Sequence, residues 1–137
     1  GLLASLRFRI SPRLKAAGLE LVWDVSDLPH WPQGHAPALR QLQYILFEGL
    51  SNVLQHSGAT RLTLSARDGG DHLQVSLIDN GRGWRNEGEG QGLQTMRGRA
   101  SVIGARIEFL TPPEGGAELR VSLPMQRDGH LDLSSAA

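Results

Sequence analysis

The stretch Tyr44–Ser57, YILFEGLSNVLQHS, decides how the rest of this chain is interpreted. Its apolar residues recur at helical spacing, and Glu48, Asn52 and His56 follow one another at steps of four residues, which places them on one side of a helix. The stretch Asp79–Gly83, DNGRG, is typical of a strand that ends in a glycine turn with one carboxylate at the break. A carboxylate, an amide and several glycines together indicate a nucleotide-binding pocket.

The predicted helix begins near Pro37 and ends before Gly58, since proline suits the first position of a helix and glycine the position after the last. At about 100° per residue, five apolar side chains form a stripe that faces the core. Glu48 points away from this stripe and Asn52 lies at its border. His56 leans toward it, so packing or capping explains His56 as well as a phosphate contact does. The stripe consists of Leu39, Leu42, Leu46, Leu50 and Val53.

The composition indicates one domain without a dominant charge. The chain has 137 residues, enough for one hydrophobic core, and its 14 basic residues balance 14 acidic ones. This balance argues against nucleic acid or an anionic membrane as the main partner. The absence of cysteine excludes disulfides and thiolate metal sites, and no apolar run approaches the roughly 20 residues that cross a bilayer. Because the chain begins at Gly1 without methionine, we expect a piece of a longer protein.

The periodicity of the remaining segments predicts an α+β fold. Residues 1–17 give either a helix interrupted at Pro12 or the tail of an upstream element. We expect a two-layer α/β sandwich, in which helices cover one face of a mixed, mainly antiparallel sheet. The domain spans residues 1–124, and a frayed tail follows at 125–137. The predicted strands are Leu19–Val25, Thr60–Arg67, His72–Asp79, Ala105–Leu110 and Ala117–Leu123, and the second helix is Gly92–Ile103.

Four segments, EGLSNVLQHS, DNGRGW, GQGLQTMRGRA and GGAELRVSLP, resemble one known family in their order and spacing. They are similar to the ATP-binding catalytic domain of bacterial sensor histidine kinases, in the branch of the nitrate sensors and thermosensors, which has a short nucleotide lid. This domain has the Bergerat fold of the GHKL superfamily, which also includes DNA gyrase B, heat-shock chaperone, mismatch-repair and anti-sigma-factor kinase ATPases. The resemblance covers about residues 15–124.

For the first segment, the resemblance implies a catalytic residue and a metal ligand. Glu48 matches the acidic residue that orients or activates the phosphoryl acceptor, although a solvated helix face explains a lone glutamate equally well. Asn52 matches the amide that binds Mg²⁺, a hard cation that takes oxygen ligands. His56 matches a position that is often basic, and it is counted with Asn52 among the nucleotide-binding residues.

For the later segments, the resemblance implies the remaining nucleotide contacts. Asp79 matches the carboxylate that accepts a hydrogen bond from the exocyclic amine of adenine, which favours adenine over guanine, whereas an aspartate that caps the turn is the alternative. Trp84 packs on the lid or on the base, and Arg97 and Arg99 contact phosphate or solvent. Glycines let the backbone pass close to a ligand and offer free N–H groups at a helix start. The implied nucleotide-binding residues are Asp79, Gly81, Gly83, Gly90, Gly92 and Leu93.

One position departs from the family pattern. The last strand of the family usually begins with a Gly-Thr pair whose hydroxyl supports the adenine-binding aspartate, whereas this chain has Gly116 and Ala117. Affinity is then weaker, or water replaces the hydroxyl. In addition, none of the five histidines lies in a helical hairpin of the kind that carries a phosphoacceptor.

The resemblance therefore implies the ATP-binding domain of a protein histidine kinase, with ATP and Mg²⁺ as cofactors and low activity in isolation. The implied partners are a helical dimerisation and phosphoacceptor domain of the parent kinase and, indirectly, a response regulator, but neither nucleic acid nor membrane. The domain is expected to be cytoplasmic in a parent anchored in the inner membrane. The alternatives are an anti-sigma-factor-type serine kinase, and a degenerate module that binds nucleotide without turnover, for which Ala117 leaves room.

Overall fold

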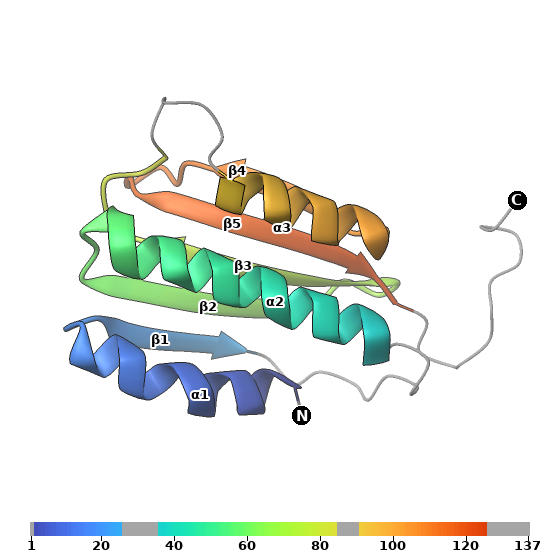
Figure 1. The fold of residues 1–137 in the computed structure, drawn as a ribbon, viewed down its shortest axis with the longest axis horizontal. Coiled ribbons are helices and arrows are strands. Elements are labelled where there is room, and N and C mark those ends of the chain that lie inside the picture. Colours follow the sequence, from blue (N-terminus) through green and yellow to red (C-terminus); the bar gives the residue numbers. More distant parts are fainter. Residues whose placement is uncertain (1, 26–35, 85–90, 126–137) are drawn as a thin grey trace, which may run out of the picture.

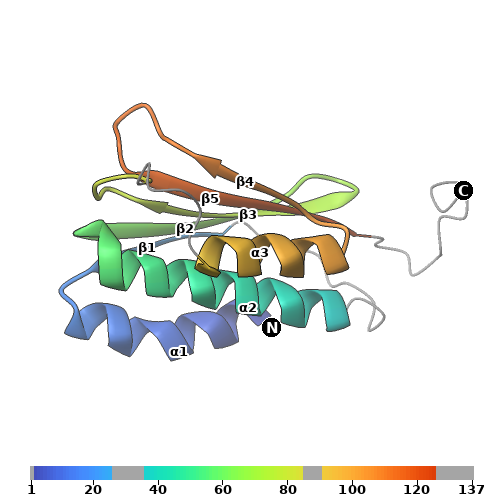
Figure 2. The same cartoon turned by 45° about the horizontal axis from the view of Figure 1, so that its top comes forward.

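The computed structural model describes residues 2–25, 36–84 and 91–125, which form a sheet covered by helices. In chain order the elements are α1 (Leu2–Ala16), β1 (Glu20–Val25), α2 (Ala36–Asn52), the π-helical turn η2 (Val53–Ser57), β2 (Arg61–Asp68), β3 (His72–Asp79), α3 (Gln91–Val102), β4 (Arg106–Leu110) and β5 (Ala117–Pro124). The sheet order is β1-β2-β3-β5-β4, with β1 parallel to β2 and all other neighbours antiparallel. The three α-helices lie side by side over one face of the sheet (Figures 1 and 2). The predicted α+β sandwich is confirmed.

The core lies between the sheet and the helices. Alternate residues of the central strands point into it, among them Leu62 and Leu64, whose side chains are fully buried. The predicted apolar stripe of α2 is buried against these strands, with Leu42 and Leu46 fully enclosed. Ile45 is also fully buried, so the apolar face of α2 is wider than predicted, because α3 packs along this helix as well.

Helix α1 corrects the prediction of an interruption at Pro12. It runs without a break from Leu2 to Ala16, with Pro12 inside it. Leu6, Ile10 and Leu14, at steps of four residues, are at most 2% exposed and anchor the helix to the core. Pro12 and the residue four positions before it are exposed, so the carbonyl that proline leaves without an amide donor lies on the solvent side.

The main helix ends in a way that the sequence did not predict. The chain leaves α-helical geometry after Asn52 and makes the π-helical turn η2, which Gly58 ends with a φ of 65°. Gly58 is therefore confirmed as the stop of the helix. A π turn closes i to i+5 and shifts later residues around the axis, so the expected alignment of His56 with Glu48 and Asn52 stays a prediction. The side chain of His56 lies outside the described part of the chain.

The folded domain continues one residue beyond the predicted boundary at 124. Met125 is 4% exposed, and its N–H donates a hydrogen bond to the carbonyl of Asp71 at 2.8 Å. The assignment of Met125 to a frayed tail is wrong, because its side chain fills one end of the core. The other residues of the predicted tail, 126–137, lie outside the described residues.

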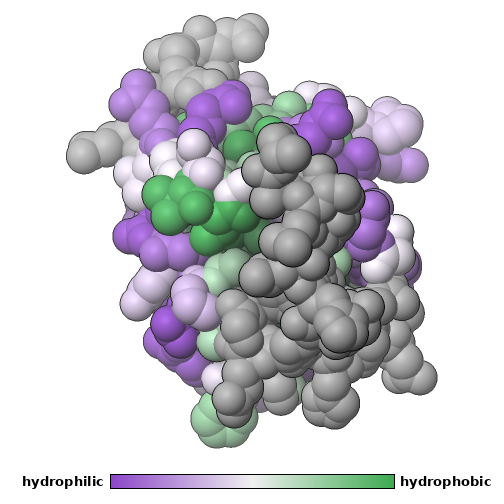
Figure 3. All heavy atoms as spheres, turned by 90° about the vertical axis from the view of Figure 1, so that its right-hand side faces the viewer, coloured by the Kyte–Doolittle hydropathy of each residue, from purple (hydrophilic) through white to green (hydrophobic). Residues whose placement is uncertain are grey.

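The topology brings several element ends together at one end of the molecule. The end of η2, the end of β3, the start of α3 and the start of β5 all lie at the left of Figure 1. Figure 3 views the opposite end, where an apolar area is bordered by hydrophilic side chains. The residues predicted to bind nucleotide therefore gather away from that area.

Candidate functional site

Asp79 occupies the last position of β3 and is 6% exposed. Its Oδ1 accepts a hydrogen bond from the N–H of Gly81 at 2.8 Å, and the backbone N–H of Ala117 on β5 is a second donor. Burial raises the pKa of Asp79 above its ordinary value, while the two N–H groups act in the opposite direction. The bond to Gly81 is the turn cap of the alternative interpretation, and a carboxylate has lone pairs that can accept from further donors. Ala117 thus supplies a backbone donor where the family pattern has a hydroxyl.

Two glycines let the end of β3 and the start of β5 approach each other closely. Gly83 has a φ of 85°, and a Cβ there would lie 3.0 Å from the carbonyl oxygen of Gly116. Gly116 has a φ of 89°, and a Cβ there would overlap the carbonyl oxygen of Asp79. The sequence indicated Gly83 as a site residue but missed Gly116 in this role. The pair of glycines just before the last strand was the feature of the sequence that could have indicated this role of Gly116.

Glu48 and Asn52 of α2 meet the start of α3. A Cβ on Gly92 would lie 2.6 Å from Oε1 of Glu48 and 3.6 Å from Oδ1 of Asn52. Glycine at this position therefore lets the helix start approach both oxygens. Glu48 and Asn52 are both half-buried. This is expected for Asn52 at the border of the apolar stripe, whereas Glu48 was predicted to point away from the stripe. Leu93, the next residue, is half-buried and packs against the core.

Gly49 sets how closely α2 crosses the sheet. A Cβ on Gly49 would lie 2.8 Å from Cδ2 of Leu119 and 3.0 Å from Cδ1 of Leu77. β3 carries Leu77 and ends at Asp79. This close approach therefore brings the helix that carries Glu48 and Asn52 onto the strand that ends in the buried carboxylate. Sequence reasoning missed Gly49, because a glycine inside a helix gives no sign of what it packs against.

The aromatic residue that follows the DNGRG motif packs on β4. Trp84 meets Phe109 with ring centroids 5.1 Å apart at an interplanar angle of 84°, and its Nε1 donates to the carbonyl of Leu110 at 2.8 Å. The sequence left the lid and the base as partners of Trp84, and both stay predictions beside these contacts with β4. Arg97 of α3 lies over the ring of Phe109, with Cζ 4.7 Å from the ring centroid. Arg99 donates to Oε1 of Gln41 at 3.0 Å, so both arginines have partners within the protein.

The side-chain oxygens of Asn52 and Glu48 suit a cation that takes most of its ligands from phosphates and waters. Among the described residues, no group of three or more His, Cys, Asp or Glu side chains is arranged to hold a metal. The amide oxygen of Asn52 and the carboxylate of Glu48 are hard donors, and Mg²⁺ usually binds through one or two protein oxygens plus phosphates and waters. The residues therefore fit Mg²⁺ that arrives with a phosphate ligand.

Within the described residues, no helix is long and apolar enough to cross a membrane. Gly90, a predicted phosphate contact, lies outside them.

The chain is similar in sequence to known proteins. The family described as histidine kinase-, DNA gyrase B- and HSP90-like ATPase matches residues 38–127. Sensor protein VraS of Staphylococcus aureus is 32% identical over 123 residues, covering 86% of this chain and 34% of that protein. Sensor protein VraS of Staphylococcus haemolyticus is 29% identical over 119 residues, covering 83% of this chain and 32% of that protein. The chain thus spans about a third of the length of these relatives.

Solved structures show the same fold at low sequence identity. The catalytic domain of histidine kinase ThkA has a TM-score of 0.74 at 12% identity and covers 90% of this chain and 91% of that one. Full-length ShkA in complex with AMPPNP has a TM-score of 0.76 at 24% identity, covering 93% of this chain and 30% of that one.

Because the family match extends over more than half of the chain, the chain belongs to the histidine kinase-, DNA gyrase B- and HSP90-like ATPases, which are ATP-binding domains. Within that family, the similar proteins described above are sensor proteins and histidine kinases.

Proposed function

We propose that this domain binds Mg·ATP at the end of the sheet where β3, η2 and α3 meet, and delivers the γ-phosphate to a histidine on a helical dimerisation domain of a longer parent protein. The observation that carries the proposal is the closeness of the start of α3 to Glu48 and Asn52, where a Cβ on Gly92 would lie 2.6 Å and 3.6 Å from their oxygens. The start of α3 lies at the same end of the molecule as the end of β3, whose last residue is the buried Asp79. One nucleotide could reach both groups at this end of the sheet, with its base at the Asp79 carboxylate and its phosphates at the oxygens of Glu48 and Asn52.

Asp79 is proposed to bind the base. Its carboxylate accepts a hydrogen bond from the exocyclic amine of adenine, whereas guanine presents a carbonyl oxygen at the corresponding position. The backbone donors at Gly81 and Ala117 keep the carboxylate in place for this bond. Gly83 has a left-handed φ and no side chain, which lets the loop after β3 turn close to Gly116 next to the proposed base site.

Asn52 and Glu48 are proposed to act at the phosphates. The amide oxygen of Asn52 would hold Mg²⁺, which when bound neutralises charge on the phosphates that it bridges. The carboxylate of Glu48 would orient the acceptor imidazole and take its proton as the phosphoryl group arrives. The start of α3 at Gly92 and Leu93 offers backbone N–H groups to phosphate oxygens. Gly90 and His56 complete the set of proposed nucleotide contacts.

The parent protein is proposed to be a sensor kinase of the nitrate-sensor and thermosensor branch. The sensor proteins that resemble this chain are about three times its length, which leaves room for a dimerisation and phosphoacceptor domain elsewhere in the parent. The ATP-binding domain would then end close to residue 124 and work on the cytoplasmic side of an inner-membrane-anchored protein, with a response regulator as the indirect partner.

Calorimetry and phosphotransfer test this function together. Titration with ATP, ADP and GTP in the presence of Mg²⁺ should give modest affinity for the adenine nucleotides and none for GTP. Mixing the domain, ATP and an excised histidine-bearing helical hairpin of the parent should give acid-labile phosphate on the hairpin. Absence of adenine-nucleotide binding, tight GTP binding, or acid-stable phosphate on a partner serine would each overturn the proposal.

A further inference from the structure

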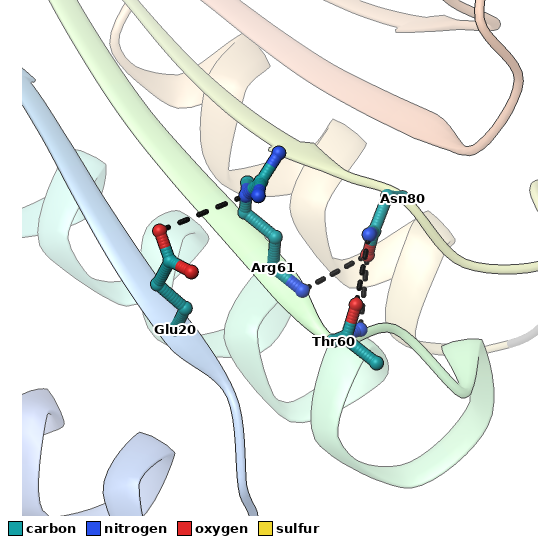
Figure 4. A network of polar contacts seen from close by, with 4 residues as sticks. All are labelled: Glu20, Thr60, Arg61 and Asn80. Atoms are coloured by element: carbon teal, nitrogen blue, oxygen red, sulfur yellow. Dashed lines mark hydrogen bonds and ion pairs between the residues drawn. The ribbon is translucent and has the colours of Figure 1, made fainter.

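Asn80, the second residue of the DNGRG motif, joins the loop after β3 to the segment that leads into β2 (Figure 4). Its Oδ1 accepts hydrogen bonds from the N–H groups of Thr60 and Arg61, both at 2.9 Å. Its Nδ2 donates to Oγ1 of Thr60 at 2.9 Å, and its own N–H donates to the carbonyl of Arg61 at 3.3 Å. One side chain and one backbone amide therefore connect two consecutive residues to the motif.

The segment that Asn80 holds is the exit of the helix that carries Glu48 and Asn52. Thr60 follows Gly58, the stop of that helix, by two residues. The carbonyl of Thr60 also accepts a hydrogen bond from the N–H of Glu20 on β1 at 2.9 Å, so the segment is held from the other side as well. It is a fixed point against which the loop after β3 can be positioned.

A second residue of the motif reaches the same place. The guanidinium of Arg82 lies beside Gly58, where a Cβ would be 3.4 Å from its Nε. The backbone between Asn80 and Arg82 is residue Gly81, whose N–H holds the Asp79 carboxylate at 2.8 Å. The donor to Asp79 is thus bracketed by two residues that contact the helix exit.

We propose that Asn80 is a positioning residue of the nucleotide site. It orients the Gly81 N–H that holds the Asp79 carboxylate, and it sets the loop after β3 relative to the helix with Glu48 and Asn52. Asparagine suits this task because one planar group both accepts from two N–H groups and donates to a hydroxyl. The inference rests on the proposed function, in which Asp79 binds adenine.

The test compares ATP with purine riboside triphosphate, which lacks the exocyclic amine. The variants are Asn80→Ala, which removes every side-chain bond, and Thr60→Val, which removes only the hydroxyl partner. Thr60→Ser keeps the hydroxyl and is the conservative control. Glu20→Gln is a second control, because the exposed Glu20–Arg61 ion pair is 3.7 Å long and contributes little. Calorimetry gives the Kd of each nucleotide, and thermal melts identify the temperature at which every variant is folded.

The wild type should prefer ATP over the purine analogue by about tenfold, the effect of one hydrogen bond to a charged group. Asn80→Ala should weaken ATP binding about tenfold and remove most of that preference, and Thr60→Val should lie between, at about threefold. Both controls should bind as the wild type does. This loss of discrimination is specific, because a variant that only lowers stability leaves the Kd of its folded fraction, and the ratio between nucleotides, unchanged.

Two failures can be told apart. A wild type that binds neither nucleotide, or binds both equally, overturns the role of Asp79 in the proposed function. A wild type that prefers ATP, together with folded Asn80→Ala and Thr60→Val variants that keep the full preference, overturns the inference about Asn80 alone. If Asn80→Ala does not fold, Thr60→Val decides the matter, because it removes one exposed hydrogen bond and keeps the other three.

Discussion

Gly92→Ala should separate the stability of α3 from the position of Glu48. Alanine favours a helix interior over glycine by about 1 kcal/mol, and α3 gains a part of this because Gly92 is its second residue. The new Cβ would lie 2.6 Å from Oε1 of Glu48, well inside contact distance, but 3.6 Å from Oδ1 of Asn52, an ordinary contact. Because a carboxylate at the end of a flexible side chain moves easily, Glu48 should turn away while Asn52 stays. Its new position costs about 0.5–1.5 kcal/mol if the rotamer is strained, which roughly cancels the helical gain.

The chain offers a matched control in the same helix. A Cβ at Gly98 would meet nothing within 4 Å, and this residue is exposed. Gly98→Ala should therefore raise Tm by about 3–5 °C, the shift that about 1 kcal/mol produces in a domain of this size, and leave phosphotransfer unchanged. Gly92→Ala should leave Tm near the wild-type value.

The two variants should differ most in phosphotransfer. With the histidine-bearing hairpin in trans, Gly92→Ala should slow transfer on the order of 100-fold, the lower end of the effect of an acid–base group, while its ATP affinity changes little. Calorimetry measures the affinity, and labelled phosphate on the hairpin measures the rate. If Gly92→Ala transfers phosphate as fast as Gly98→Ala, Glu48 does not act at the reacting phosphate and the reasoning is refuted.

Three further predictions follow from burial and charge. Asp79→Asn should abolish ATP binding in calorimetry and leave the circular dichroism spectrum unchanged; normal ATP binding would disprove the adenine assignment. Because burial raises the pKa of Asp79, its stabilising contribution is full below the unfolded value of 3.8 and is lost as pH rises through the higher native pKa. The Tm of Asp79→Asn should therefore rise relative to the wild type between that value and neutral pH, and a falling difference would contradict the assigned environment. Ile10→Ala should lower the free energy of unfolding by about 2–5 kcal/mol, whereas Phe8→Ala, at a position 83% exposed, should change it little; equal effects would mean that α1 is not part of the core.

Most of the element order could be predicted because each segment carries its own pattern. The bounds of β3 agree with the prediction, and Gly58 and Gly104 end their helices with left-handed φ values as expected. These features depend on alternation, helical spacing and glycine conformations, all of which are local. Residue type and spacing also singled out Glu48, Asn52 and Asp79 as candidate site residues, and their roles stay a prediction that rests on the family resemblance.

The predictions for Pro12 and Met125 were wrong for one reason: contacts between segments that are distant in the sequence decided the local structure. Pro12 predicted an interruption, but the burial of Leu6, Ile10 and Leu14 holds α1 together across it. Met125 looked like part of a polar tail, yet it fills a place in the core.

The sequence by itself determined the fold class, the family resemblance and the chemistry of Glu48, Asn52 and Asp79, because these follow from local periodicity and from the functional groups that the motifs contain. Only the tertiary structure decided how the motifs are joined. It placed Gly92 against two oxygens of α2, Gly116 against the carbonyl of Asp79, and Asn80 on the helix exit. These approaches arise because the strands and helices pack at distances of van der Waals contact and hydrogen bonding, and no spacing along the chain specifies which residues will meet.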